Sequence, residues 1–131
     1  MAFFLEKAED RRYLRLTFEG SVTIKELVQS QTALKMSLSE SDGYKKALVD
    51  MRKAPSALSG IDIHQFVSTH KKELPPGFLI AVIVEPDNWA AAIFAENIAQ
   101  NRGIYMRVFR DEMHAFAWLG ISDEEQRTPA L

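Results

Sequence analysis

Two short apolar runs constrain the fold of this chain more than any other feature. Residues 46–51 (KALVDM) and 78–84 (FLIAVIV) are dominated by apolar side chains and lack the strict alternation of a strand with one solvated face. Such runs are typical of strands that are buried on both faces, as they are in parallel sheets. The segment between them has helical spacing of apolar residues, so we predict two parallel strands joined by a crossover helix.

The remaining pattern completes an α/β fold. Residues 13–19 alternate between apolar and polar side chains, which is the period of a half-buried strand, and a polar turn connects them to an apolar segment at 2–8. We therefore predict an antiparallel hairpin at the edge of a mainly parallel five-stranded sheet, with a fifth strand at 104–109. The expected order is β-β-α-β-α-β-α-β-α, with four helices.

Local signals at the helix ends support this order. Thr23 and Glu26 form a capping box, and we expect the helix after it to bury Ile24, Leu27, Val28, Leu34 and Leu38. We expect Ser59 and Asp62 to start a second helix that extends to Leu74. Asp87 and Asp111 are the expected N-caps of the third and fourth helices, and Gly103 and Gly120 follow their last turns.

Composition limits the classes of function. The chain has 131 residues, so we expect one domain at 1–121 and a polar C-terminal tail at 122–131. The absence of cysteine excludes disulfides, thiolate catalysis and cysteine zinc sites. The net charge of −2 and the lack of a basic stripe argue against nucleic-acid binding. With no signal peptide and no apolar segment long enough to span a membrane, a cytoplasmic location is expected.

Three stretches resemble the STAS superfamily and, within it, the SpoIIAA-like proteins. They are 14–27 (LRLTFEGSVTIKEL), 46–52 (KALVDMR) and 108–119 (VFRDEMHAFAWL). The resemblance implies a parallel sheet with helices stacked on it and an additional N-terminal strand. For the SpoIIAA-like branch it implies no settled biochemical activity.

The resemblance also bears on a phosphorylation switch. STAS regulators carry Asp-Ser-Ser-Gly at the start of the helix after the Asp-ended strand, where a kinase phosphorylates the second serine and a partner protein reads its charge. The nearest match here is residues 58–61 (LSGI), in which Ser59 replaces the first serine and Gly60 occupies the acceptor position. We therefore predict no switch at residue 60, and a surviving switch would have to use Ser59 or Ser56.

Five residues at or after the carboxyl end of the 46–51 strand are candidates for a ligand or partner site. Asp50 and Arg52 end a strand whose carboxyl end is where open α/β sheets bind ligands, although Asp50 could instead bond its own loop. Ser56, Ser59 and Gly60 precede a helix whose free N–H groups could hold an anion, or they form an ordinary N-cap.

Trp89 is a further candidate. Ala90–Ala92 beside it would let another helix or an acyl chain approach, or the ring could fold back on the sheet edge. We expect no catalytic residues, metal site or cofactor, because the spacing of His64, His70 and His114 suits no metal and nucleotide-binding and nucleophile-elbow motifs are absent.

Two functional hypotheses remain. The first is a non-enzymatic regulatory or binding module that acts through a protein partner or a small apolar or anionic ligand, at the loops after the parallel strands. The alternative is a small enzyme or a lipid or acyl carrier that uses an apolar cleft near Trp89 and Phe94. We also expect a two-fold homodimer, because of the apolar edge strand and the small residues around Trp89.

Overall fold

The computed structural model describes residues 3–8, 12–20, 23–40, 44–54 and 77–121. The expected strands are all present, with ends that differ by one or two residues. In chain order the elements are β1 (Phe3–Ala8), β2 (Tyr13–Glu19), α1 (Ile24–Glu40), β3 (Lys46–Lys53), β4 (Leu79–Ile83), the 3-10 turn η2 (Pro86–Asn88), α3 (Trp89–Asn101), β5 (Tyr105–Phe109) and α4 (Glu112–Leu119). The expected helix at 59–74 lies outside the described residues, so three α-helices are described where four were expected.

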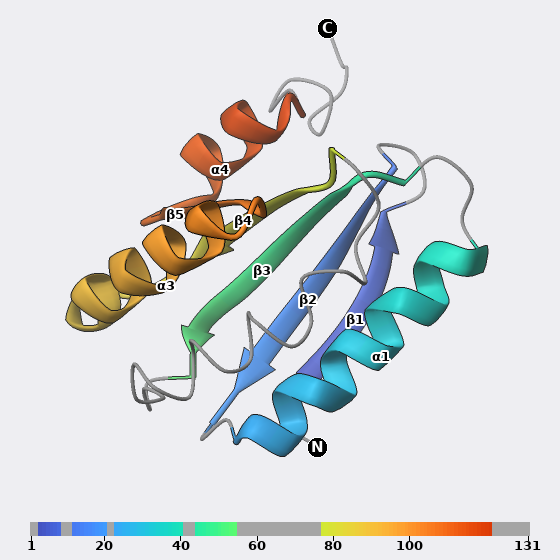
Figure 1. Cartoon of the computed structure of the whole chain (residues 1–131), viewed down its shortest axis with the longest axis horizontal. Helices are drawn as coiled ribbons and strands as arrows, with labels where there is room; N and C mark the ends of the chain where they lie inside the picture. Colours follow the sequence, from blue (N-terminus) through green and yellow to red (C-terminus); the bar gives the residue numbers. More distant parts are fainter. Residues whose placement is uncertain (1–2, 9–11, 21–22, 41–43, 55–76, 122–131) are drawn as a thin grey trace, which may run out of the picture.

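The five strands form one mixed sheet in the order β1-β2-β3-β4-β5. The hairpin strand β1 pairs antiparallel with β2, and every later pair in the sheet is parallel. Figure 1 shows the strands side by side in this order, with α1 beside β1 and with α3 and α4 near β5. The predicted mainly parallel sheet with an antiparallel edge strand is therefore confirmed.

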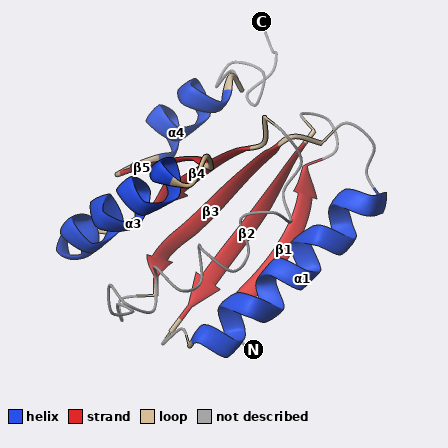
Figure 2. Cartoon of the chain, in the orientation of Figure 1, coloured by secondary structure: helices blue, strands red, loops and turns tan. Residues whose placement is uncertain are grey.

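Helices cover both faces of the sheet (Figure 2). On one face, Leu14 of β2 packs with Leu34 of α1, and Val82 of β4 packs with Ala92 of α3. On the other face, α4 covers a cluster that unites several strands: Tyr13, Leu48, Ala81, Ile83, Ala115, Phe116 and Leu119. Both faces of β3 are thus covered, which explains why its sequence lacks alternation.

Side-chain and glycine caps fix the start of α1 and both ends of α4 where the sequence predicts them. At α1, the Thr23 N–H donates to Glu26 Oε1 over 2.9 Å, and the Glu26 N–H donates to Thr23 Oγ1 over 3.2 Å. At α4, Asp111 accepts the His114 backbone N–H over 2.9 Å. Gly120 then ends α4 at φ = 78°, a left-handed conformation that glycine adopts without steric strain.

Two helix predictions are wrong in detail. Asp87 does not cap α3: residues 86–88 form the 3-10 turn, and Asn88 occupies the N-cap position without a side-chain hydrogen bond. Pro86 has no N–H and suits a first-turn position, which favours an early tight turn. In α1, Val28 is exposed, whereas Ser30 is buried and donates its hydroxyl to the Leu27 carbonyl over 2.7 Å. That local bond satisfies the hydroxyl inside the core.

Helix α3 also covers the backbone of the edge strand β5. The Gln100 side-chain amide donates to the Met106 carbonyl over 3.2 Å. The Val108 N–H donates to Glu96 Oε1 over 3.0 Å. Two polar backbone groups of an edge strand are therefore bonded within the chain.

Among the described helices, none combines the length and the apolar character that crossing a membrane requires.

Candidate functional site

The structure places half of the predicted site residues. Asp50 and Arg52 lie near the carboxyl end of β3, and Trp89 is the first residue of α3. Ser56, Ser59 and Gly60 lie outside the described residues. The site is therefore built around Asp50 and Arg52, at the end of the sheet where ligands of open α/β folds bind.

Asp50 is a buried carboxylate, only 8% exposed, and Arg52 contacts both of its oxygens. Oδ1 accepts the Arg52 backbone N–H and the Arg52 Nε–H, each over 3.0 Å. Oδ2 accepts from Arg52 Nη2 over 2.8 Å. Asp50 thus holds both the backbone and the side chain of a residue two positions later in its own strand. The loop that Asp50 was expected to bond lies largely outside the described residues.

Two further residues complete an ion network that the sequence did not reveal. Arg15 Nη2 lies 3.0 Å from Asp50 Oδ2 and 2.7 Å from Glu112 Oε2. Arg52 Nη2 also contacts Glu112 Oε2, over 3.1 Å. Each arginine therefore bridges the same two carboxylates. We call Arg15, Asp50, Arg52 and Glu112 the ion network.

The sheet register and one helix cap bring the ion network together. Thr17 of β2 pairs with Asp50 of β3, so Arg15, two residues before Thr17, points to the same face as Asp50. Glu112 is the first residue of α4, and the Asp111 cap fixes where that helix begins. The signal in the sequence was the polar face of the alternating 13–19 strand, but its partner across the sheet depended on the register.

The network perturbs the acid–base equilibria of its members. Burial alone would raise the pKa of Asp50, but hydrogen bonds from Arg52 and the charges of Arg52 and Arg15 lower it below its ordinary value. The hydrogen bond to Asp50 raises the pKa of Arg52. Burial alone would lower the pKa of Arg15, but the hydrogen bond and charge of Glu112, with the charge of Asp50, raise it. All three groups are held in their charged forms.

The chemistry open to the ion network is limited by this pairing. Two guanidinium groups and two carboxylates sum to zero charge, and a carboxylate whose pKa is lowered is a weaker base at neutral pH. In the part of the chain that the structure describes, no three histidine or acidic side chains gather as a metal site would require. The arrangement fits a rigid charged support better than a reacting centre.

A pH dependence follows from the lowered pKa of Asp50. The stabilisation by this group is present above its unfolded pKa of about 3.9 and is lost as the pH falls through the lower folded value. We expect the difference in unfolding free energy between wild type and Asp50→Asn to shrink on acidification. Urea unfolding of both proteins at pH values of about 6, 4 and 3 measures it. A difference that is the same at all three would contradict this account.

Trp89 is partly buried against the core on the α3 face, and the Arg110 guanidinium lies 4.7 Å from the centre of its ring. The Trp89 ring thus packs back against the sheet, which is one of the two alternatives that the sequence left open. Phe94 is 49% exposed. Neither residue lines the cleft that the structure shows beside β5.

Exposed apolar side chains flank the ion network. Phe4 of β1 is 52% exposed and pairs with Thr17, which points to the same face as Arg15. Met113 is 63% exposed and follows Glu112 at the start of α4. We call Phe4, Thr17 and Met113, together with the ion network, the network surface.

Comparison with solved structures finds a similar fold. One solved structure that matches this chain is the crystal structure of an uncharacterised protein from the DUF3478 family with a SpoIIAA-like fold, from Shewanella loihica PV-4. It superposes with a TM-score of 0.55 at 25% sequence identity, and the match covers 90% of this chain and 92% of that chain. No family model matches the sequence, and no curated protein matches it either. The structural likeness spans nearly the whole of both chains.

Proposed function

Since the chain is a STAS-like domain with a SpoIIAA-like fold, we propose that it is a non-enzymatic regulatory module that binds a protein partner through the network surface. The observation that carries this proposal is the closed pairing within the ion network. The charged groups at the functional end of the sheet neutralise one another and leave no free carboxylate poised as a base.

The composition of the network surface supports a protein as the occupant. Protein interfaces are enriched in aromatic residues, methionine and arginine relative to the rest of the protein surface. Here Phe4 and Met113 supply apolar area, and Arg15 and Arg52 are held in place by their carboxylate partners. A pre-ordered arginine loses less side-chain entropy when a partner binds it. The ion network would therefore give the partner a rigid surface to bind.

Site-specific photo-crosslinking in the native host tests this proposal. A benzoylphenylalanine at position 4 or at position 113 is expected to capture one and the same protein. The same residue at position 36 serves as the control, because Met36 is 60% exposed on α1, which covers the opposite face.

Binding of the purified partner then provides the decisive measurement. Titration calorimetry should show that Phe4→Asp weakens binding at least about tenfold, a loss of about 1.4 kcal/mol, whereas Met36→Asp leaves it unchanged. Equal capture from all three positions, or a partner whose affinity ignores Phe4→Asp in a folded variant, would show that the network surface is not the docking site.

A further inference from the structure

We propose that the cleft beside β5 binds a small organic anion that carries a flat apolar group. The cleft has a volume of about 520 Å³, within the range of about 300–1,000 Å³ that is usual for small-molecule sites. It lies away from the ion network, so this proposal is independent of the protein partner proposed above. Its walls come from β5, the end of α3 and the last turn of α4.

Arg107 is the group that would hold the anion. Its side chain is exposed and lines the cleft. Among the described residues, no ion pair or hydrogen bond engages its guanidinium. By contrast, Arg15 and Arg52 contact carboxylates, and the Arg110 guanidinium lies over the Trp89 ring. A free guanidinium offers parallel N–H donors that match a carboxylate or a phosphate.

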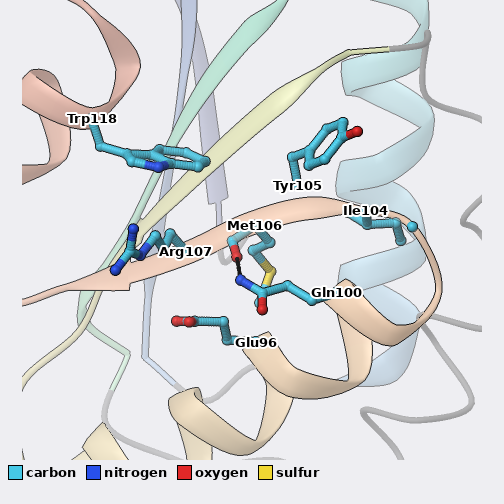
Figure 3. Close-up of a pocket in the computed structure, with 8 residues that line it drawn as sticks. Glu96, Gln100, Ile104, Tyr105, Met106, Arg107 and Trp118 are labelled. Atoms are coloured by element: carbon cyan, nitrogen blue, oxygen red, sulfur yellow. Dashed lines mark hydrogen bonds between the residues drawn. The ribbon is translucent and has the colours of Figure 1, made fainter.

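Two aromatic rings on the same side of β5 supply the apolar contact. Figure 3 shows Trp118, Arg107 and Tyr105 together on one side of the strand. Trp118 is held by its packing against Phe109, with ring centres 5.8 Å apart, and Tyr105 is 58% exposed. Aromatic faces favour flat groups in offset or edge contacts. An anion on Arg107 would therefore carry its flat group toward these rings.

The α3 side of the cleft determines what the site rejects. Glu96 and Gln100 lie on the other side of the strand in Figure 3. They bond the Val108 N–H and the Met106 carbonyl, two groups with which an added peptide strand would pair. The edge is thus closed to strand addition, which favours a small molecule. The Glu96 carboxylate repels an anion from its own side and directs it to Arg107.

An NMR titration with naphthalene-2-carboxylate tests the proposal. We expect saturable shifts confined to the amides of residues 103–108 and to the Trp118 indole N–H. Arg107→Gln should weaken binding at least about tenfold, the usual effect of losing a hydrogen bond to a charged group. The matched control is Arg110→Gln, which removes another exposed arginine outside the cleft and should leave the affinity unchanged.

Neutral and cationic probes of the same shape complete the experiment. Naphthalene-2-methanol should bind more weakly than the carboxylate, and 2-naphthylmethylamine more weakly still. Tyr105→Ala should weaken binding of the carboxylate probe, while the amide spectrum of the variant stays that of a folded protein. The proposal is overturned if no saturable shift arises at the cleft below about 10 mM. It also fails if the three probes bind alike or if Arg107→Gln binds as tightly as wild type.

Discussion

Replacing Phe18 by alanine is expected to lower the free energy of unfolding by about 3–5 kcal/mol. Phe18 is 1% exposed and is the largest fully buried side chain among the residues that the structure describes. It packs with Leu16 and Ala54, and its ring centre lies 6.0 Å from that of Phe3 on the paired strand. Removing the ring loses its burial and leaves a cavity that β2 and β3 can fill only in part. Domains have a total stability of about 5–15 kcal/mol, so the loss is a large share.

Phe4 provides the matched control, because it is the same residue type on the adjacent strand and is 52% exposed. Phe4→Ala should cost less than about 1 kcal/mol, since most of the surface that it loses is already in water. Denaturant unfolding at pH 7 measures both variants. Equal losses for Phe18→Ala and Phe4→Ala would show that β1 and β2 do not pack as described.

Replacing Asp50 by alanine is the second large change, with an expected loss of about 2–3 kcal/mol. Alanine would leave the Arg52 N–H and the Arg52 guanidinium without their main acceptor, and it would remove one of the two carboxylates that Arg15 contacts. Removing one partner of a fully buried ion pair lowers the free energy of unfolding by about 3–5 kcal/mol. The loss should be smaller here, because the Arg15 and Arg52 side chains are 22% and 33% exposed and stay partly hydrated.

Two variants separate a structural Asp50 from a functional one. Asp50→Asn keeps one oxygen acceptor and should be less destabilised than Asp50→Ala. Glu19→Ala removes an exposed carboxylate that lies 3.9 Å from Lys53 and should stay within about 0.5 kcal/mol of wild type. If melting curves show that Asp50→Ala is as stable as wild type, the structural account fails and Asp50 becomes the leading functional residue.

Much of the fold could be predicted because its signals are local. The apolar runs of β3 and β4 reflect burial on both faces, and the pairs Thr23–Glu26 and Asp111–His114 lie within one helical turn. The prediction that Asp87 caps α3 was wrong because Pro86 favours a tight first turn, and residues 86–88 form that turn instead. The prediction that Val28 is buried was wrong because helical spacing alone does not fix which edge of an apolar stripe faces the sheet.

The ion network could not be predicted because its contacts join residues that are far apart in the sequence. Arg15 is 35 residues from Asp50 and 97 from Glu112, and the chain offers 16 basic and 18 acidic side chains as possible partners. Only the register of β2 on β3 and the docking of α4 select these four. Arg107 was missed similarly, because the cleft beside it exists only where α3, β5 and α4 meet.

The unequal edges of the sheet limit how copies of this chain can add to one another. A unit with two open edges can grow into a filament, whereas a unit with one open edge can join only once. Gln100 and Glu96 occupy backbone groups of β5, which leaves β1 as the edge for strand addition among the described strands. The homodimer expected from the sequence stays a prediction, but any assembly through strand addition would stop at two copies and could not polymerise.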